Sequence, residues 1–310
     1  MKQRILYFEG LDHPGFEEKE IASGSGMRFL TMDFSTVSPG TELFCIREGG
    51  KCFPGYIMTG HDESGRHFFV FPSMKESHGA HCNCRAFDAE TLLVELPEGF
   101  PLELAGFLRF ANIGLLPLLR YGALPEEVAV IGLGPVGNLA AQSARILGCR
   151  VVGVDRSLPR RRLAEACGIE ETMSPEEFGR EKRRFDRVID TVSGSGTLSA
   201  AAEALRDGGI CHMVGIVKEG ELAASALCRE IWNRDLRFLS GWEMKHSFEA
   251  IRANLERAIR WIGQGRYILP PLLSRVIPPE LPAIGAAYRS LADDPDHHFC
   301  CAIDWRGAEK

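Results

Sequence analysis

The sequence predicts an α/β protein in which a doubly wound parallel sheet is set within a β-rich part of the chain. The first observation is the segment V-A-V-I-G-L-G-P-V-G at 128–137, followed by V-V-G-V-D at 151–155. The second is an alternation of apolar runs with helical periods between about residues 106 and 266. The third is a series of short strand-like segments with frequent Gly and Pro turns on both sides of that region.

The glycine-rich segment predicts a pocket for a dinucleotide. Gly132 permits a tight turn, Gly134 lets the backbone approach a pyrophosphate, and Gly137 lets the next helix lie close to the strand. That helix, expected near 136–147, points its N-terminal amides and its dipole at the phosphates. A βα turn without a ligand is the plainer alternative. The residues expected to hold the cofactor here are Gly132, Leu133, Gly134, Pro135, Val136 and Gly137.

Asp155, at the end of the second strand, indicates which cofactor binds. Its carboxylate can accept hydrogen bonds from both hydroxyls of an adenosine ribose, whereas a 2′-phosphate would meet like charge there. NAD is therefore predicted over NADP. Arginine is the usual partner of a 2′-phosphate, so Arg156 and the triplet at 160–162 leave NADP as the alternative. We interpret Arg156 as packing on the adenine and the triplet as the solvated start of a helix.

The pattern along the chain predicts two domains. Residues 1–105 read as strands separated by turns, one of them at 38–40. The tail at 267–310 is too short to fold alone, so we expect it to complete the first domain around a nucleotide-binding domain at 106–266. Within 106–266 strands are expected near 128–132, 150–154, 186–190, 210–215 and 236–240, and helices near 103–121, 136–147, 160–167, 196–206 and 247–263.

Composition limits the partners that the protein can take. The 45% hydrophobic and 25% charged residues are typical of a globular protein. The net charge of −6 does not favour nucleic acid or an anionic membrane as a partner. No membrane span or signal-peptide core is visible, so a cytoplasmic protein with a small-molecule substrate is expected. The ten cysteines form no C-x-x-C, and Cys82 and Cys84 are too close for a zinc knuckle, which predicts reduced structural thiols.

Five further motifs extend over nearly the whole chain: S-P-G-T-E at 38–42, L-P-E-G at 96–99, I-D-T-V-S-G at 189–194, H-M-V-G at 212–215 and A-I-D-W at 302–305. With the glycine-rich segment they resemble the medium-chain dehydrogenase/reductase superfamily of alcohol and polyol dehydrogenases. The resemblance implies a GroES-like β-rich catalytic domain, an inserted Rossmann domain and a homodimer, with the strand region after Gly215 at its interface. It also implies that Val192, Val214 and Gly215 contact the cofactor.

The departures from this family concern its catalytic zinc. Pro39 stands where the family has a zinc-binding cysteine, Tyr56 stands where it has a histidine, and Ile57 replaces the adjacent carboxylate. The helix that supplies the third ligand contains no Cys, His, Asp or Glu between residues 105 and 125. The four-cysteine structural zinc loop is also missing. Three protein ligands and an open position are needed for Lewis-acid catalysis, so we predict no catalytic zinc.

Without the metal, side chains must exchange the hydroxyl proton and stabilise the developing alkoxide. Thr41 matches the family's proton-relay hydroxyl. The alternative is that its side chain only holds the turn. Tyr56 occupies the vacated ligand position, where a phenol can donate to a carbonyl or alkoxide oxygen, or simply fill the space of the metal. Glu42 resembles the family's structural acid and is expected to form buried hydrogen bonds beside the substrate pocket.

The histidines are the other acid–base candidates. His78 and His81, in S-H-G-A-H, are the imidazoles best placed for proton transfer near neutral pH, with a packing turn as the alternative. His61 and His67 flank a turn and are expected to be solvated. Trp242 follows a strand, at the end of the sheet where α/β proteins bind ligands, and either lines the substrate pocket or covers the domain edge.

The leading interpretation is a zinc-independent, NAD-dependent oxidoreductase that interconverts a secondary alcohol with its ketone, the substrate being a polyol or a biosynthetic intermediate. A reductase of double bonds or quinones that uses NAD(P)H is the second reading, although Asp155 and the glycine pattern weigh against it. The third is a protein that binds NAD without catalysis.

Overall fold

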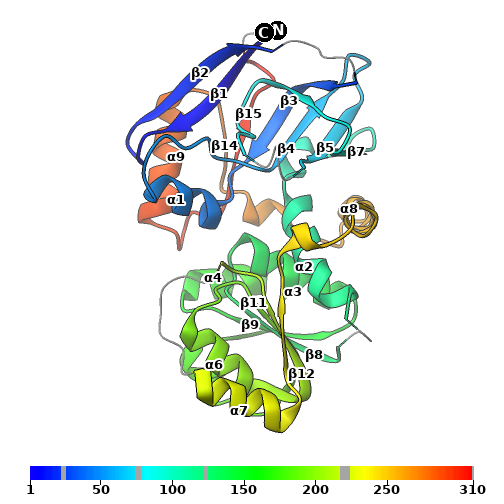
Figure 1. The fold of residues 1–310 in the computed structure, drawn as a ribbon, viewed down its shortest axis with the longest axis vertical. Helices are drawn as coiled ribbons and strands as arrows, with labels where there is room; N and C mark the ends of the chain where they lie inside the picture. The colour runs from blue at the N-terminus through cyan, green and yellow to red at the C-terminus, as the bar shows by residue number, and fades with distance from the viewer. Residues whose placement is uncertain (22–25, 74–77, 122–124, 217–223, 309–310) are drawn as a thin grey trace. The chain divides into compact units, whose positions relative to one another are not determined.

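The structure of the protein is a computed structural model that forms two compact units (Figure 1). Unit 1 comprises Met1–Arg109 and Leu272–Lys310, and unit 2 comprises Phe110–Pro271. The predicted α/β fold class is confirmed. None of the described helices is long and apolar enough to span a bilayer. The residues that the structure describes are 1–21, 26–73, 78–121, 125–216 and 224–308.

Unit 1 is built around a mixed sheet. Its described strands are β3 (Arg28–Thr36), β4 (Met58–His61), β5 (His67–Phe71), β6 (Cys84–Phe87), β7 (Leu92–Glu95), β14 (Arg275–Ile277) and β15 (Cys301–Asp304). They run in the order β14-β15-β3-β4-β5-β7, with β6 also paired to β3. The C-terminal strand β15 thus lies directly beside β3, because the tail supplies strands that the N-terminal segment lacks.

A hairpin and two helices complete the core of unit 1 (Figure 1). Strands β1 (Lys2–Phe8) and β2 (Pro14–Glu20) pair antiparallel, and the helices are α1 (Pro39–Arg47) and α9 (Leu281–Asp293). Among the fully buried side chains are Phe8, Phe87, Tyr288 and Trp305, which come from four separate elements or their ends. Burial of these large side chains ties the tail to the N-terminal segment.

The turn predicted at 38–40 is wrong, because these residues begin helix α1. Ser38 is the N-cap, and Pro39 lies in the first turn, where its missing N–H and fixed φ cost nothing. The Glu42 carboxylate reaches back and accepts the Ser38 backbone N–H at 2.7 Å. A Ser-Pro pair followed by an acid is therefore a helix start here and not a chain break.

Unit 2 contains a parallel sheet whose order is β10-β9-β8-β11-β12-β13 among the described strands. Their bounds are β8 (Glu127–Ile131), β9 (Arg150–Val154), β10 (Glu171–Met173), β11 (Phe185–Asp190), β12 (Leu205–Met213) and β13 (Arg237–Ser240). The helices are α2 (Phe107–Leu119), which begins in unit 1, α3 (Pro135–Ile146), α4 (Leu158–Ala166), α5 (Pro175–Phe178), α6 (Ser195–Ala204), α7 (Ala224–Arg234) and α8 (Phe248–Gly263). Helices α5 and α7 and strand β10 are additional to the predicted elements.

Both faces of this sheet are buried. Val128 and Val130 of β8 join a core cluster that includes Ala140 of α3, whereas Ala129 and Ile131 join a second cluster that includes residues of α6. Alternate residues of one strand thus enter two different cores, which explains why β8 reads as a continuous apolar run. The parallel order brings the carboxyl ends of the strands to one edge.

Buried His212 of β12 gives unit 2 an acid-sensitive point. The imidazole is fully buried, and neither ring nitrogen has a hydrogen-bond partner among the described residues. Its ring centroid lies 5.1 Å from that of Tyr121. Burial lowers the pKa of His212 to about 3, and the neighbouring Arg187 guanidinium adds to the effect.

We expect His212 to make unit 2 less stable as the pH falls. Below about pH 6.5 the imidazole takes up a proton in the unfolded chain, whereas in the folded chain it stays neutral down to about pH 3. Lowering the pH from 7 to 5 should therefore remove about 2 kcal/mol of unfolding free energy through this group. Urea unfolding at both pH values measures the loss. In His212→Phe the loss should be smaller by that amount, and an equal loss in both proteins contradicts the assignment.

Candidate functional site

The glycine-rich turn of unit 2 connects β8 to α3 in a form that only glycine permits. Gly132 has a φ of +86°, in the left-handed region. A Cβ at Gly137 would lie 1.7 Å from the Gly132 carbonyl oxygen, so the helix could not approach the strand with any larger residue. A Cβ at Gly134 meets nothing closer than Arg160 Nη1 at 3.8 Å, which leaves this part of the turn open. The turn fits a bound pyrophosphate.

The Asp155 side chain holds the same turn from the end of β9. The residue is 8% exposed; its Oδ2 accepts the Leu133 N–H at 2.7 Å and its Oδ1 accepts the Ser157 N–H at 2.8 Å. Each carboxylate oxygen can accept a second hydrogen bond, so the capacity for two ribose hydroxyls remains. Asp155 is therefore both a structural support of the turn and a candidate ribose ligand.

The arginine triplet at 160–162 is not simply a solvated helix start, which corrects the sequence-based interpretation. Arg161 Nη1 donates to the Asp155 carbonyl oxygen at 2.6 Å, so this side chain fixes the end of β9. The Arg160 guanidinium lies over Gly134, as described above. Arg156 and Arg162 are exposed. Arg160 and Arg161 differ from Arg162 because they lie close to the backbone of the turn. A linear sequence does not reveal this proximity.

The end of β11 supports the turn from its other side. Thr191 Oγ1 donates to the carbonyl oxygens of Ile131 at 2.9 Å and Gly132 at 3.1 Å. Fully buried Asp190 accepts the Val192 N–H at 2.9 Å and the Thr197 hydroxyl at 2.6 Å. Burial raises the pKa of Asp190, while these donors oppose the rise.

The predicted cofactor contacts in the following segments lie at the same edge of the sheet. The Asp190 carbonyl oxygen accepts the N–H groups of Val214 at 2.8 Å and Gly215 at 3.2 Å, so the ends of β11 and β12 are joined. Val192 is 49% exposed, which leaves an apolar surface beside the turn. Trp242 follows β13 and is 48% exposed. Its ring centroid lies 5.2 Å from Lys245 Nζ. This carboxyl edge is where open α/β sheets bind ligands.

In unit 1 the structure brings Tyr56 to the start of α1. The Tyr56 and Ser38 hydroxyl oxygens are 2.8 Å apart, and the Ser38 N–H donates to Glu42. Thr41 lies in the first turns of α1 and is partly buried. The Arg109 guanidinium lies 5.1 Å from the Tyr56 ring centroid and 3.7 Å from that of Phe71. We name Ser38, Tyr56 and Arg109 the tyrosine cluster.

Ser38 and Arg109 of this cluster were missed by the sequence-based reasoning. Arg109 is 3% exposed, although it is charged. Its signal was a single cation in the apolar run G-F-L-R-F-A. A charged side chain is almost never fully buried unless it is paired. The position of Arg109 in this apolar run could therefore have marked it as a candidate site residue.

Glu42 belongs to a buried network behind α1, as expected of a structural acid. Its Oε2 lies 2.9 Å from His81 Nε2 and accepts the Tyr288 hydroxyl, while His81 Nδ1 lies 2.7 Å from the Ser35 hydroxyl. Burial, followed by the neighbouring Glu42 carboxylate, raises the pKa of Tyr288 well above its ordinary value. The phenol therefore keeps its proton and donates. His81 is fully buried in this network, whereas His78 is exposed.

His78 and His81 thus lie in different surroundings. His78 is exposed, and its carbonyl oxygen accepts a hydrogen bond from Arg85 at 2.7 Å. Part of the S-H-G-A-H segment, Ser77, lies outside the described residues. His81 is held by three hydroxyl or carboxylate groups, which favours a role in positioning α1.

The residues at the family's catalytic zinc position do not fit a metal ion. Pro39 offers no donor, and Ile57 is a fully buried aliphatic side chain. The Tyr56 phenol bonds to Ser38. One phenol is not a zinc site, which needs three nitrogen, sulfur or carboxylate ligands.

The expectation that His61 and His67 are solvated holds only in part, because each imidazole is partly exposed and also contacts Asp33. His61 Nδ1 lies 2.8 Å from one carboxylate oxygen of Asp33, and His67 Nδ1 lies 2.7 Å from the other. The Asp33 side chain is 2% exposed, and the imidazoles are 33% and 39% exposed. The turn between them is exposed, but pairing of β4 with β5 brings both rings onto the carboxylate.

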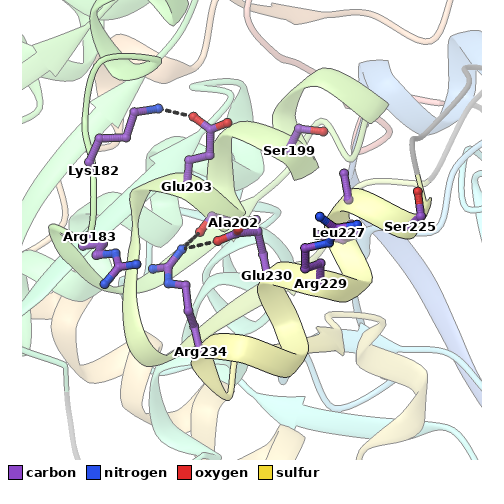
Figure 2. Close-up of a pocket in the computed structure, with 11 residues that line it drawn as sticks. Lys182, Arg183, Ser199, Ala202, Glu203, Ser225, Leu227, Arg229, Glu230 and Arg234 are labelled. Atoms are coloured by element: carbon purple, nitrogen blue, oxygen red, sulfur yellow. Dashed lines mark hydrogen bonds and ion pairs between the residues drawn. The ribbon is translucent and has the colours of Figure 1, made fainter.

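A groove elsewhere in unit 2 does not contain any predicted site residue. It has a volume of about 640 Å³ and lies along α6 and α7 (Figure 2). Figure 2 shows two ion pairs among its charged side chains, one between Lys182 and Glu203 and one between Arg234 and Glu230. Its lining comprises Lys182, Arg183, Ser199, Ala202, Glu203, Ser225, Ala226, Leu227, Arg229, Glu230 and Arg234.

Known proteins share this sequence pattern and this fold. Residues 135–261 match the family described as zinc-binding dehydrogenase. An NADP-dependent alcohol dehydrogenase of Mycolicibacterium smegmatis is 31% identical over 185 residues, which is 57% of this chain and 53% of the relative. Galactitol 1-phosphate 5-dehydrogenase of Escherichia coli is 26% identical over 189 residues, 58% of this chain and 54% of the relative. These alignments cover about half the length of the curated relatives.

Solved structures resemble the protein over almost its whole length. Galactitol-1-phosphate dehydrogenase of Escherichia coli has a TM-score of 0.82 at 18% identity, with 97% of this chain and 99% of that chain covered. L-idonate 5-dehydrogenase of Escherichia coli has a TM-score of 0.81 at 14% identity, with 98% of each covered. The parallel sheet and the glycine turn give unit 2 a Rossmann-like fold, and unit 1 has a GroES-like fold. Residues 135–261 are similar to the zinc-binding dehydrogenase family, and the fold of the chain is shared with these two dehydrogenases.

Proposed function

We propose that the protein is an NAD-dependent, zinc-independent oxidoreductase that interconverts a secondary alcohol, such as a polyol, with its ketone. The observation that carries the proposal is the glycine turn held by Asp155, because both the space for a pyrophosphate and a free acceptor capacity for ribose are present there. The names of the relatives, which are alcohol and polyol dehydrogenases, support the same class of reaction.

The residues around the turn supply the nucleotide site. When bound, the nicotinamide accepts or gives the hydride. The chain's own contribution is to bind and orient the cofactor. The amides at the start of α3 would face its phosphates, and the Asp155 carboxylate would accept hydrogen bonds from its ribose hydroxyls. Val192, Val214 and Gly215, on the neighbouring strand ends, complete the cofactor site.

The tyrosine cluster serves the substrate hydroxyl. Tyr56 exchanges a proton with it, and Ser38, 2.8 Å away, fixes the direction of the phenol. Buried Arg109 stabilises negative charge that develops on the substrate oxygen, the task that a metal performs in zinc-dependent dehydrogenases. Thr41 assists from α1. Glu42 and His81 hold α1 in place.

We also propose a homodimer in the cytoplasm. Likeness to the superfamily supports the dimer, although residues 217–223, beyond Gly215, lie outside the described part of the chain. All ten cysteines are free thiols, which suits a reducing compartment.

The cofactor preference is the direct test of the proposed function. Titration of the protein with NADH and NADPH, followed by nicotinamide fluorescence, should show NADH binding at least about tenfold more tightly, because a 2′-phosphate would be repelled by buried Asp155. Arg162→Ala is the matched control, since this exposed arginine of the same segment should leave the NADH affinity unchanged. Equal or tighter NADPH binding, weakened by Arg156→Ala, contradicts the NAD assignment.

Turnover is measured in parallel with a panel of secondary alcohols and polyols. Reduction of NAD by any of them supports the oxidoreductase. A protein that binds NADH tightly but reduces no cofactor with the panel or with enone and quinone acceptors is a binding module instead.

A further inference from the structure

Asp33, His61 and His67 form a compact group in unit 1, which we name the His-Asp cluster. Their donor atoms all lie within 4.8 Å of one another. The two carboxylate oxygens are divided between the two rings, at 2.8 Å from His61 Nδ1 and 2.7 Å from His67 Nδ1. Three potential metal ligands thus converge on one point.

The sheet itself builds this arrangement. His61 and His67 are directly opposite each other in the β4–β5 pair, with ring centroids 5.6 Å apart. The register of β3 against β4 shifts between Met32 and Phe34, so Asp33 is an extra residue in its strand. Such a bulge redirects a side chain that would otherwise follow the strand alternation. The bulge brings the Asp33 carboxylate to the two imidazoles.

The rest of the surroundings holds the ligands in place. The Asp33 carbonyl oxygen accepts the Trp305 N–H at 2.9 Å, which fixes the bulge against the tail. In the hairpin turn, Asp62 Oδ1 accepts the Ser64 N–H at 2.9 Å and the Arg66 N–H at 3.1 Å. The connection between the two histidines is therefore ordered by its own hydrogen bonds, and the donor set is preorganised.

The charge of the cluster favours a cation. A carboxylate that is 2% exposed is costly unless it is paired, and the Asp33 carboxylate contacts the two imidazoles. Arg306 interacts with Asp33 through space, but its guanidinium donates to Asp304 at 2.7 and 2.9 Å. A divalent ion between the rings would compensate the buried charge directly.

We propose that the His-Asp cluster binds one divalent transition-metal ion, such as Zn²⁺. Two imidazole nitrogens and one carboxylate oxygen suit Zn²⁺, Co²⁺ or Ni²⁺ better than Mg²⁺ or Ca²⁺. The imidazoles are a third or more exposed, so a fourth position is open to water. Because His61 ends β4 whereas Tyr56 precedes it, this site is separate from the family's zinc position. The inference does not rest on the proposed oxidoreductase activity.

The test measures metal on the chelator-treated full-length protein. Equilibrium dialysis against Zn²⁺ should give one equivalent per chain, and X-ray absorption should show nitrogen and oxygen neighbours at about 2.0–2.2 Å without sulfur. His61→Ala and His67→Ala should each lower the affinity by more than the roughly 10- to 100-fold that removal of an outer-sphere partner costs. Co²⁺ provides a second probe, because its visible spectrum reports the ligand set.

His297→Ala/His298→Ala is the matched control. These histidines lie 2.9 and 3.6 Å from the Asp294 carboxylate, but they follow the end of α9 and are not on paired strands. The control should bind Zn²⁺ as the parent protein does. The proposal is overturned if the parent binds less than one equivalent, if X-ray absorption shows sulfur ligands, or if the His61 and His67 variants retain the ion. Sulfur ligands are detected on the parent protein itself. The test can therefore be decided even where a variant fails to fold.

If the His61 and His67 variants retain the metal, the ion lies at another site. That result would also count against the proposed zinc-independent reaction. By contrast, failure of the cofactor titration would leave the metal result unchanged.

Discussion

Gly137→Val should abolish nucleotide binding while the β-rich unit stays folded. Even a single Cβ at this position would lie 1.7 Å from the Gly132 carbonyl oxygen and 3.3 Å from Thr191 Oγ1. Since the first contact is with the backbone, no rotamer change relieves it, and the turn or the start of α3 must move. The amides of the turn would then no longer face the phosphates.

The expected result is a loss of NADH affinity of at least about 100-fold in the fluorescence titration, equivalent to about 2.7 kcal/mol or more. Gly196→Ala is the matched control: the residue lies in α6, and a Cβ there meets nothing within 4 Å. That variant should bind NADH normally. Circular dichroism of both variants checks that the fold persists. Unchanged NADH binding in a folded Gly137→Val protein would place the cofactor elsewhere.

The nucleotide domain was predictable because its chemistry is local. Alternating strands and helices, the glycine spacing and Asp155 follow one another within about thirty residues, and each has a direct steric or electrostatic reason. Confirmed elements include β8, β9, β11 and α3, with boundaries displaced by at most one residue. Helix α7 was missed, although Leu227 and Ile231, which pack against the core, have the i, i+4 spacing of one helix face.

The clusters of unit 1 were less predictable, because they depend on contacts between distant segments. The bond between Tyr56 and Ser38 joins residues 18 positions apart, and Glu42 meets Tyr288 across 246 positions. The His-Asp cluster needs both a strand register and a bulge. A single sequence shows the residue types but not these pairings. Helix α1 shows the opposite difficulty: Ser38 and Pro39 were read as a break, although the same residues are good helix starts.

The structure also changes how the histidines are understood. His81 was predicted to exchange protons, and it lies fully buried between Ser35, Glu42 and Tyr288. Acid–base catalysis requires contact with the reacting group, directly or through one water. Its surroundings favour positioning of α1, which leaves the tyrosine cluster as the group best suited to serve the substrate.

Tyr56→Phe should therefore lower turnover strongly while leaving the fold intact. The substitution removes only the phenolic oxygen that bonds to Ser38, so the ring and its contact with the Arg109 guanidinium remain. Loss of general acid–base help costs roughly 10²- to 10⁴-fold in kcat. The measurement is steady-state kinetics with NAD and the best alcohol of the panel, with NADH affinity determined on the same sample. We expect kcat to fall and NADH affinity to stay unchanged.

Tyr267→Phe is the matched control for this experiment. It removes a phenolic oxygen that also has a hydroxyl partner, Ser143 Oγ at 2.7 Å, but the ring is buried in unit 2 against Trp261. The control should lower stability, because Ser143 loses a buried partner, with little change in kcat. Ser38→Ala should cause an intermediate fall in kcat, since the phenol remains but is no longer oriented. If Tyr56→Phe retains full turnover, the hydroxyl proton passes through another group, and Thr41 becomes the next residue to substitute.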